Sequence, residues 1–280
     1  MFARMASAIT ALFFLSTPHQ AAASCTLRFA WSAWEPFHYR APDGTMQGLD
    51  YELVGEAARR MGCAVLWHEM PRGRAVALLK EGRMDAMAGV TLTGERLAFA
   101  RFSRPLRPGR NVLLVRKGET GRFPFSGLEQ LADSHFRLGS NPASRYSPIH
   151  AELVEQGRLD DNAIPVPAEE NALTMLLRDR IDGFITGRLI AERMLRDGDM
   201  AGRVEIHPMH IEVSMAHVMF SRASVAPEVV AGFNRALESM AADGTLAAST
   251  DGLWPGMQSG GQTVPGIPTI STAPAMTAKR

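Results

Sequence analysis

Apolar and polar positions alternate along residues 24–253 in stretches of two kinds. Short apolar runs such as 27–31 and 84–90 have the length of buried strands. Between such runs, apolar residues recur at helical spacing, as over 53–61, where Asp50 is predicted to be the N-cap of the helix. The alternation of the two patterns predicts an α/β fold, with parallel sheets covered by helices on their faces.

The same reading predicts the elements of the whole chain. Strands are expected over 27–31, 64–67, 84–90, 111–115, 137–139, 163–166 and 181–186, and helices over 50–62, 72–81, 149–156, 169–180, 189–196 and from Pro227 onward.

Both ends of the chain differ from this pattern. Residues 1–23 have the order of a signal peptide, with Arg4 before a short apolar run and alanines at 21–23 as the cleavage site. Residues 254–280 are rich in Gly, Pro, Ser and Thr and are predicted to be a disordered tail. The chain is therefore expected to be exported to the periplasm.

Charge and cysteines narrow the picture further. With 30 basic and 29 acidic residues and no basic run, no nucleic acid partner is expected. Cys25 and Cys63 precede two strands that would be neighbours, and neighbouring strands lie about 4.8 Å apart, so a disulfide is predicted. Residues 23–25 also resemble a lipoprotein cleavage site, although the Leu expected at the position of Ala22 is absent. A lipid anchor on Cys25 is the alternative.

Motifs for catalysis and metal binding are poor. The chain has none of the glycine-rich phosphate loops, nucleophile elbows or zinc-protease motifs. His207, His210 and His217 are the only grouped metal-ligand residues, and Pro208 opposes a helix that would present two of the rings together. No metal and no cofactor are expected.

A series of motifs in fixed order carries the strongest signal. WEPFHY at 34–39 and GLDYEL at 48–53 are followed by LLKEGRMD at 78–85, GVTLTGER at 89–96 and ADGTL at 242–246. Over about 25–253 this series resembles the family 3 extracellular solute-binding proteins, which include histidine and lysine/arginine/ornithine receptors.

The resemblance implies a type II periplasmic binding fold, in which two α/β lobes are joined by two crossover strands and a ligand binds between them. Lobe 1 would comprise 24–111 and 212–253, and lobe 2 would comprise 112–211. The crossover strands are expected near Asn111 and over 211–214. The protein is expected to be a monomer.

The resemblance also implies ligand contacts. Arg96 matches the arginine that holds the ligand carboxylate, which suits a planar group with two parallel N–H donors. Thr91 and Gly89 match positions beside it, and Trp34 matches the aromatic residue that covers the ligand.

Other positions indicate what kind of solute binds. Ser144 and Arg145 fall where lobe 2 contributes a small hydroxyl residue, and Arg74 lies near the expected cleft wall. Amino acid receptors of the family carry an Asp for the ligand ammonium where this chain has Gly187. Unless Glu35 substitutes for that Asp, the solute is a carboxylate that need not be an α-amino acid.

Three functions fit these expectations. The leading one is the receptor of an ABC importer, whose partner is a membrane permease. A sensor or accessory binding subunit is the second. The third is a periplasmic enzyme on the same fold, as in cyclohexadienyl dehydratases.

Overall fold

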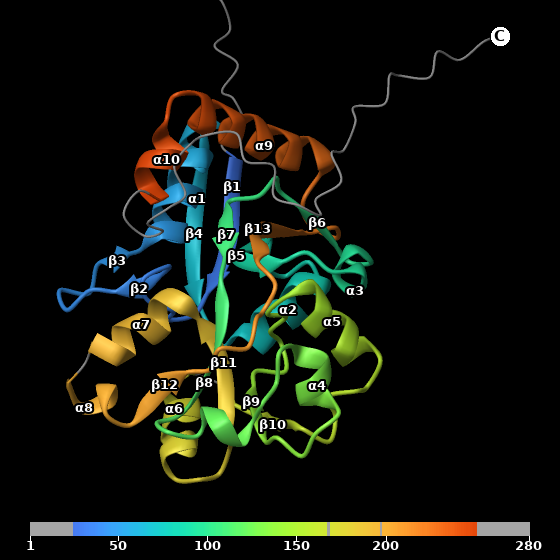
Figure 1. Ribbon diagram of the computed structural model, residues 1–280. Coiled ribbons are helices and arrows are strands. Elements are labelled where there is room, and N and C mark those ends of the chain that lie inside the picture. The colour runs from blue at the N-terminus through green and yellow to red at the C-terminus, as the bar shows by residue number, and fades with distance from the viewer. Residues whose placement is uncertain (1–24, 167–168, 197, 251–280) are drawn as a thin grey trace, which may run out of the picture.

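The computed structural model describes residues 25–166, 169–196 and 198–250. They form two lobes, each built on one sheet with helices on both faces (Figure 1). The type II periplasmic binding fold expected from the sequence is confirmed. Residues 1–24 and 251–280, which hold the expected signal peptide and tail, lie outside the described residues.

Lobe 1 is built on a sheet with the strand order β4-β1-β5-β13-β6, and β7 pairs with β13. These strands are β1 (Cys25–Trp31), β4 (Cys63–Glu69), β5 (Ala86–Thr91), β6 (Ala100–Phe102), β7 (Arg107–Gly109) and β13 (Ser214–Ser221); a small hairpin, β2 (Tyr39–Arg40) and β3 (Met46–Gln47), lies outside the sheet.

The two faces of this sheet are covered by different helices, because successive strand residues point to opposite sides. Leu27 and Phe29 of β1 share a core cluster with residues of α1 (Leu49–Arg60) and α9 (Pro227–Ala242). Ala30 of β1 belongs to the opposite cluster, with residues of α2 (Arg72–Lys80). The short α3 (Gly94–Leu97) follows β5, and α10 (Thr245–Thr250) follows α9.

Lobe 2 is built on a sheet with the strand order β10-β9-β11-β8-β12. Its strands are β8 (Asn111–Arg116), β9 (Leu138–Ser140), β10 (Ala163–Pro165), β11 (Gly183–Gly187) and β12 (Val204–Ile206). Its helices are η1 (Thr120–Arg122), α4 (Leu128–Ala132) and α5 (Pro148–Glu155), followed along the chain by α6 (Glu169–Leu177), α7 (Arg188–Arg196) and α8 (Gly198–Ala201). Separate core clusters lie on the two faces of the sheet.

The chain passes between the sheets twice. It leaves lobe 1 at β7 and enters lobe 2 at β8, with only Arg110 between them, and it returns through 207–213 to β13. The two passages run side by side, since Ser214 pairs with Gly109 (Figure 1). The second passage was expected as a strand over 211–214, but among these residues only Ser214 is in a strand.

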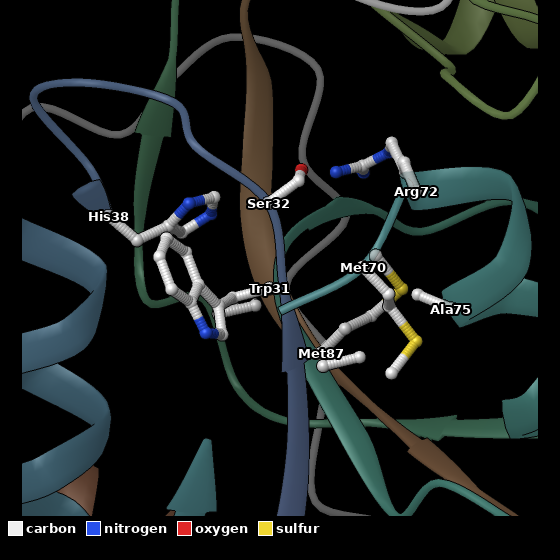
Figure 2. A pocket seen from close by; sticks show the side chains of 9 residues that line it. Trp31, Ser32, His38, Met70, Arg72, Ala75 and Met87 are labelled. Atoms are coloured by element: carbon white, nitrogen blue, oxygen red, sulfur yellow. The ribbon is translucent and has the colours of Figure 1, made fainter. Parts of the chain in front are cut away.

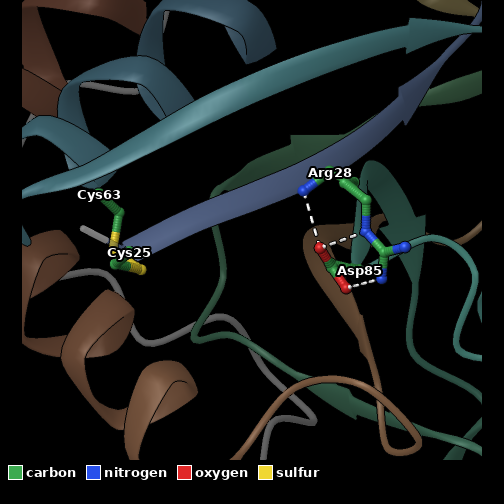
Figure 3. Close-up of a disulfide and its surroundings, with 4 residues drawn as sticks. All are labelled: Cys25, Arg28, Cys63 and Asp85. Carbon is green, nitrogen blue, oxygen red and sulfur yellow. Dashed lines mark hydrogen bonds and ion pairs between the residues drawn. A yellow bond between two sulfur atoms is a disulfide. The ribbon is translucent and has the colours of Figure 1, made fainter. Parts of the chain in front are cut away.

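Cys25 and Cys63 form the predicted disulfide at the start of β1 and β4 (Figure 3). The two residues are direct partners in the parallel register, with a Cα–Cα distance of 4.4 Å. On the same strand, Arg28 binds Asp85 through two side-chain hydrogen bonds of 2.9 and 2.7 Å. The sulfur of Cys25 is used by the disulfide, so a chain with this bond cannot carry a lipid on that residue.

Apart from the crossover expected over 211–214, each helix and strand expected from the sequence is present within a few residues of its predicted bounds. Four strands of the two sheets were not predicted: β6, β7, β12 and β13. Within the described ranges no helix has the length and apolar character needed to cross a membrane.

Candidate ligand cleft between the lobes

Arg96 lies where the two lobes meet. It is in α3, whose N-cap Thr93 accepts a hydrogen bond from the Arg96 main-chain N–H, and it is 3% exposed. Its Nη1 donates to the Thr91 carbonyl in lobe 1 and its Nη2 donates to the Ala143 carbonyl in lobe 2, both at 2.8 Å. One guanidinium therefore joins main-chain groups of both lobes.

Further contacts cross the same boundary. The Thr91 hydroxyl donates to the Arg145 carbonyl at 2.8 Å, and the Arg145 guanidinium forms an ion pair with Glu95 at 3.0 Å. On the other side of the passages, Arg193 of α7 pairs with Glu35. Since hydrogen bonds and ion pairs join the lobes on both sides, the structure is a closed form.

Gly89 and Trp34 are in close contact on the cleft side of lobe 1. Gly89 has φ +68°, a conformation that favours glycine. A Cβ atom there would lie 2.9 Å from Cζ3 of Trp34 and 3.0 Å from Oδ2 of Asp50. The Trp34 ring in turn packs on Phe37, with centroids 4.5 Å apart. A glycine at position 89 is thus needed both for backbone conformation and for space.

Asp50 forms a buried ion pair with Arg107 and is not the N-cap predicted from the sequence. Gly48 occupies the N-cap position, without a side-chain cap. The Asp50 carboxylate accepts from Arg107 Nε at 2.5 Å and Nη2 at 2.8 Å, and the two side chains are 0% and 1% exposed. The Arg107 guanidinium also lies 3.6 Å from the centroid of Phe37. Tertiary pairing has overridden the local capping preference.

Arg72 is a second cationic group at the cleft that the sequence did not single out. Its Nη2 donates to the Gly89 carbonyl at 3.2 Å, and its Nε is buried without a hydrogen-bond partner among the described residues. Figure 2 shows its guanidinium turned toward the Ser32 hydroxyl, at a cavity of about 10 Å³, room for about one water. Burial lowers the pKa of His38, which lines the same cavity. Arg74, expected near the cleft wall, is exposed.

Burial and neighbouring charges also act on Arg96. Desolvation, followed by the positive charges of Arg72 and Arg145, lowers the pKa of Arg96 to about 9. The guanidinium is still charged at neutral pH, and it lies among cations without a carboxylate in ion-pair contact in the described part of the chain.

Lobe 2 contributes a loop and a strand end. Ser144 and Arg145 line a cavity of about 150 Å³ together with His150, whose burial lowers its pKa to about 3. Gly187 ends β11, and a Cβ atom there would lie 3.5 Å from Ile190 and 3.9 Å from Phe37 of lobe 1. The position of Gly187 therefore faces lobe 1 and would accept a Cβ atom at ordinary contact distances.

The structure brings most of the expected site residues to the boundary between the lobes: Trp34, Gly89, Thr91, Arg96, Ser144, Arg145 and Gly187. It adds Asp50, Arg72 and Arg107. Arg72 could have been suspected, because it stands beside Arg74 in the same first helical turn. The ion pair of Asp50 with Arg107 joins residues far apart in sequence and leaves no local signal. No group of three or more metal-ligand side chains occurs in the described ranges.

The chain matches known proteins in sequence and in fold. The family model of bacterial extracellular solute-binding proteins, family 3, matches residues 27–252. A probable histidine-binding protein of Campylobacter jejuni is 28% identical over 85 residues, which are 30% of this chain and 33% of that protein. The match thus spans about a third of that relative's length.

Two solved structures have the same fold. A histidine-bound ABC transporter substrate-binding protein from Streptococcus pneumoniae is 22% identical, with a TM-score of 0.66, and the match covers 81% of this chain and 90% of that one. A histidine kinase sensor domain similar to periplasmic binding proteins is 17% identical, with a TM-score of 0.67, over 81% and 94% of the two chains.

Proposed function

Because the chain belongs to the bacterial extracellular solute-binding proteins of family 3, we propose that it is a periplasmic receptor of an ABC importer. It captures a small carboxylate-bearing solute between its lobes and presents the closed form to a membrane permease. It does no chemistry on the solute.

The state of Arg96 is the observation that carries this proposal. A buried guanidinium is costly unless an anion pairs with it. Arg96 is 3% exposed, yet its two terminal nitrogens contact only main-chain carbonyls in the described residues. A carboxylate would supply the missing charge and accept two parallel hydrogen bonds.

Binding and closure use the same contacts. Opening of the lobes separates Arg96 from the Ala143 carbonyl and Thr91 from the Arg145 carbonyl. Arg96 and Thr91 stay on lobe 1 and receive the carboxylate, and Trp34 covers the rest of the solute. Lobe 2 then closes by rotation at the two passages, as in other hinge proteins. The loop of Ser144 and Arg145 completes the enclosure.

Calorimetry with the Arg96→Ala variant tests the proposal. Ligands are first found by a thermal-shift screen of organic acids and amino acids, since a ligand at 100 times its dissociation constant stabilises by about 2.7 kcal/mol. Removing one member of a buried charge pair costs about 2–5 kcal/mol, which lowers affinity about 30- to several-thousand-fold.

Arg83→Ala is the matched control, because Arg83 is an exposed arginine of the same lobe, paired only with Glu81 in the described residues. It is expected to bind as the wild type does. Unchanged affinity in Arg96→Ala would contradict the proposal, and so would conversion of the ligand to a product during the titration.

Gly187→Asp tests whether the solute is an α-amino acid. The new carboxylate faces lobe 1, where the family's amino acid receptors hold the ligand ammonium. We expect the variant to gain affinity for α-amino acids and lose it for simple carboxylates, measured by competition calorimetry. If the wild type already prefers α-amino acids over simple carboxylates, another acidic residue, such as Glu35, must pair with the ligand ammonium.

A further inference from the structure

The cleft side of lobe 1 has an excess of buried positive charge. Three guanidinium groups lie there: those of Arg96 and Arg107 are buried, and that of Arg72 is partly buried, with its Nε out of contact with solvent. The carboxylate buried beside them is that of Asp50. Arg107 holds both oxygens of Asp50, at 2.5 and 2.8 Å. Arg72 lies within electrostatic reach of Asp50 and Arg96 within that of Glu95, but neither guanidinium forms an ion pair with a described carboxylate.

The other acidic residues at the boundary are already paired. Glu95 binds Arg145 and Glu35 binds Arg193. Of the nine residues that line the cavity at Arg72, all of them in the described part of the chain, none is Asp or Glu. In the closed form the nearby carboxylates of Asp50 and Glu95 are thus each paired with another arginine, and neither Arg72 nor Arg96 has an ion-pair partner of its own among the described residues.

The two unpaired guanidinium groups are held close together by one strand. Arg72 donates to the Gly89 carbonyl and Arg96 donates to the Thr91 carbonyl. Gly89 and Thr91 are two residues apart on β5, and two residues of extended chain span at most about 7 Å. The cavity at Arg72 has room for about one water in the closed form, so a single small molecule with two separated anionic groups can reach both guanidinium groups only once the lobes open.

Arg72 also has unused hydrogen-bonding capacity. Its Nε is buried without a partner, and the Ser32 hydroxyl faces the guanidinium (Figure 2). The Trp34 ring, close to Gly89, offers an apolar surface beside the carbonyl to which Arg72 donates. These features suit a short dicarboxylate with an apolar linker.

We propose that the solute is a short dicarboxylate, with one carboxylate on Arg96 and Thr91 and the other on Arg72 and Ser32. This rests on the proposed function and specifies its ligand class. Arg96 binds the carboxylate that every ligand of the site carries. Arg72 binds the second carboxylate and so favours dicarboxylates over monocarboxylates.

The test is calorimetry of the exported chain with succinate, glutarate and adipate, each compared with its monomethyl ester. The ester keeps one carboxylate and the chain length but removes one charge. We expect at least one diacid to bind about 30-fold or more tightly than its ester. Arg72→Met should reduce this ratio to about threefold or less while leaving the ester's affinity within about threefold. Arg96→Met should abolish binding of both, and the control Arg83→Met should keep the wild-type ratio.

The possible failures can be told apart. If diacid and ester bind equally to the wild type and both need Arg96, the dicarboxylate proposal is overturned and the carboxylate receptor stands. Tight binding of inorganic phosphate in place of any diacid would also overturn it. If no carboxylate binds the wild type, the proposed function falls as well. The wild-type comparison of diacid with ester decides the matter even if Arg72→Met does not fold.

Discussion

The two lobes bury a titratable side chain near their facing surfaces in opposite ways. Lobe 1 buries the charged pair of Asp50 and Arg107, with side chains 0% and 1% exposed and two hydrogen bonds between them. Lobe 2 buries His150, 1% exposed, with neither ring nitrogen hydrogen-bonded to any described residue. Burial, followed by the charges of Arg145 and Arg96, lowers the pKa of His150 to about 3.

The two lobes thus avoid an unpaired buried charge in two different ways at these side chains. A charge that leaves water must be paired, or the group must become neutral. Lobe 1 keeps Asp50 and Arg107 charged and pairs them with each other, and this pair lies beside the unpaired guanidinium groups of the proposed binding surface. Lobe 2 keeps its buried group uncharged and meets Arg96 and Thr91 with main-chain carbonyls, while its charged side chains at the boundary, Arg145 and Arg193, are paired with Glu95 and Glu35 of lobe 1. Lobe 1 is therefore expected to hold the anion, and lobe 2 to close over it.

The largest effect is expected from breaking the buried pair of lobe 1. Asp50→Asn leaves the Arg107 charge buried without its partner, and such a loss costs about 3–5 kcal/mol. Urea denaturation of the variant should show this drop in the free energy of unfolding. Glu69→Gln is the control, because its ion pair with Arg40 is exposed and exposed pairs contribute about 0–1 kcal/mol. Equal losses in the free energy of unfolding of the two variants would contradict the expectation that the buried ion pair stabilises lobe 1 more than the exposed one.

Removing the disulfide should affect lobe 1 next most strongly. The bond joins residues 38 apart in sequence, and a cross-link of this span stabilises by about 2–4 kcal/mol. Three of the four tryptophans, Trp31, Trp34 and Trp67, lie in lobe 1. Tryptophan fluorescence of a Cys25→Ala, Cys63→Ala double variant should therefore report the loss. An unchanged denaturation midpoint would argue against the bond.

Acid should weaken the protein through lobe 2. The side chain responsible is His150. In the unfolded chain it is protonated near its ordinary pKa of about 6.5, whereas in the folded chain it is protonated only near 3. Between these values the unfolded state binds the extra proton, so stability falls as pH decreases, by up to about 1.4 kcal/mol per pH unit. His150→Phe should remove about 2 kcal/mol of the difference between pH 7 and pH 5. His38 has a lowered pKa as well and should keep part of the slope. A variant with the wild-type slope would contradict the assignment to His150.

The smallest effect is expected from breaking the solvent-exposed ion pair between the lobes. The Glu95 side chain is 42% exposed in its ion pair with Arg145, and such pairs contribute about 0–1 kcal/mol. Glu95→Gln should leave folding stability almost unchanged and should weaken ligand affinity by about fivefold or less, through a shift toward the open form. Small-angle scattering with and without ligand measures that shift. A loss as large as that in Arg96→Ala would mean that this pair, not Arg96, controls binding.

Some of the site could be predicted from residue types and order. GVTLTGER contains Gly89, Thr91 and Arg96, and all three lie at the boundary as the resemblance implied. Arg72 was missed in favour of Arg74, because periodicity places both in one helical turn but does not say which guanidinium turns toward β5. The strands β6 and β7 were missed; with three residues each they carry little periodic signal, although β9 and β10, which are equally short, were predicted.

What the sequence by itself determined is local and repetitive: the alternation of strands and helices, the approximate bounds of each, and the neighbouring strand starts that bring Cys25 to Cys63. Each follows from spacing within a few tens of residues. Only the tertiary structure decided that Asp50 pairs with Arg107 instead of capping its helix, and that Arg72 and Arg96 donate to carbonyls of the same strand without an ion pair of their own. These choices depend on which distant side chains exclude water from one another, and no local pattern contains that information.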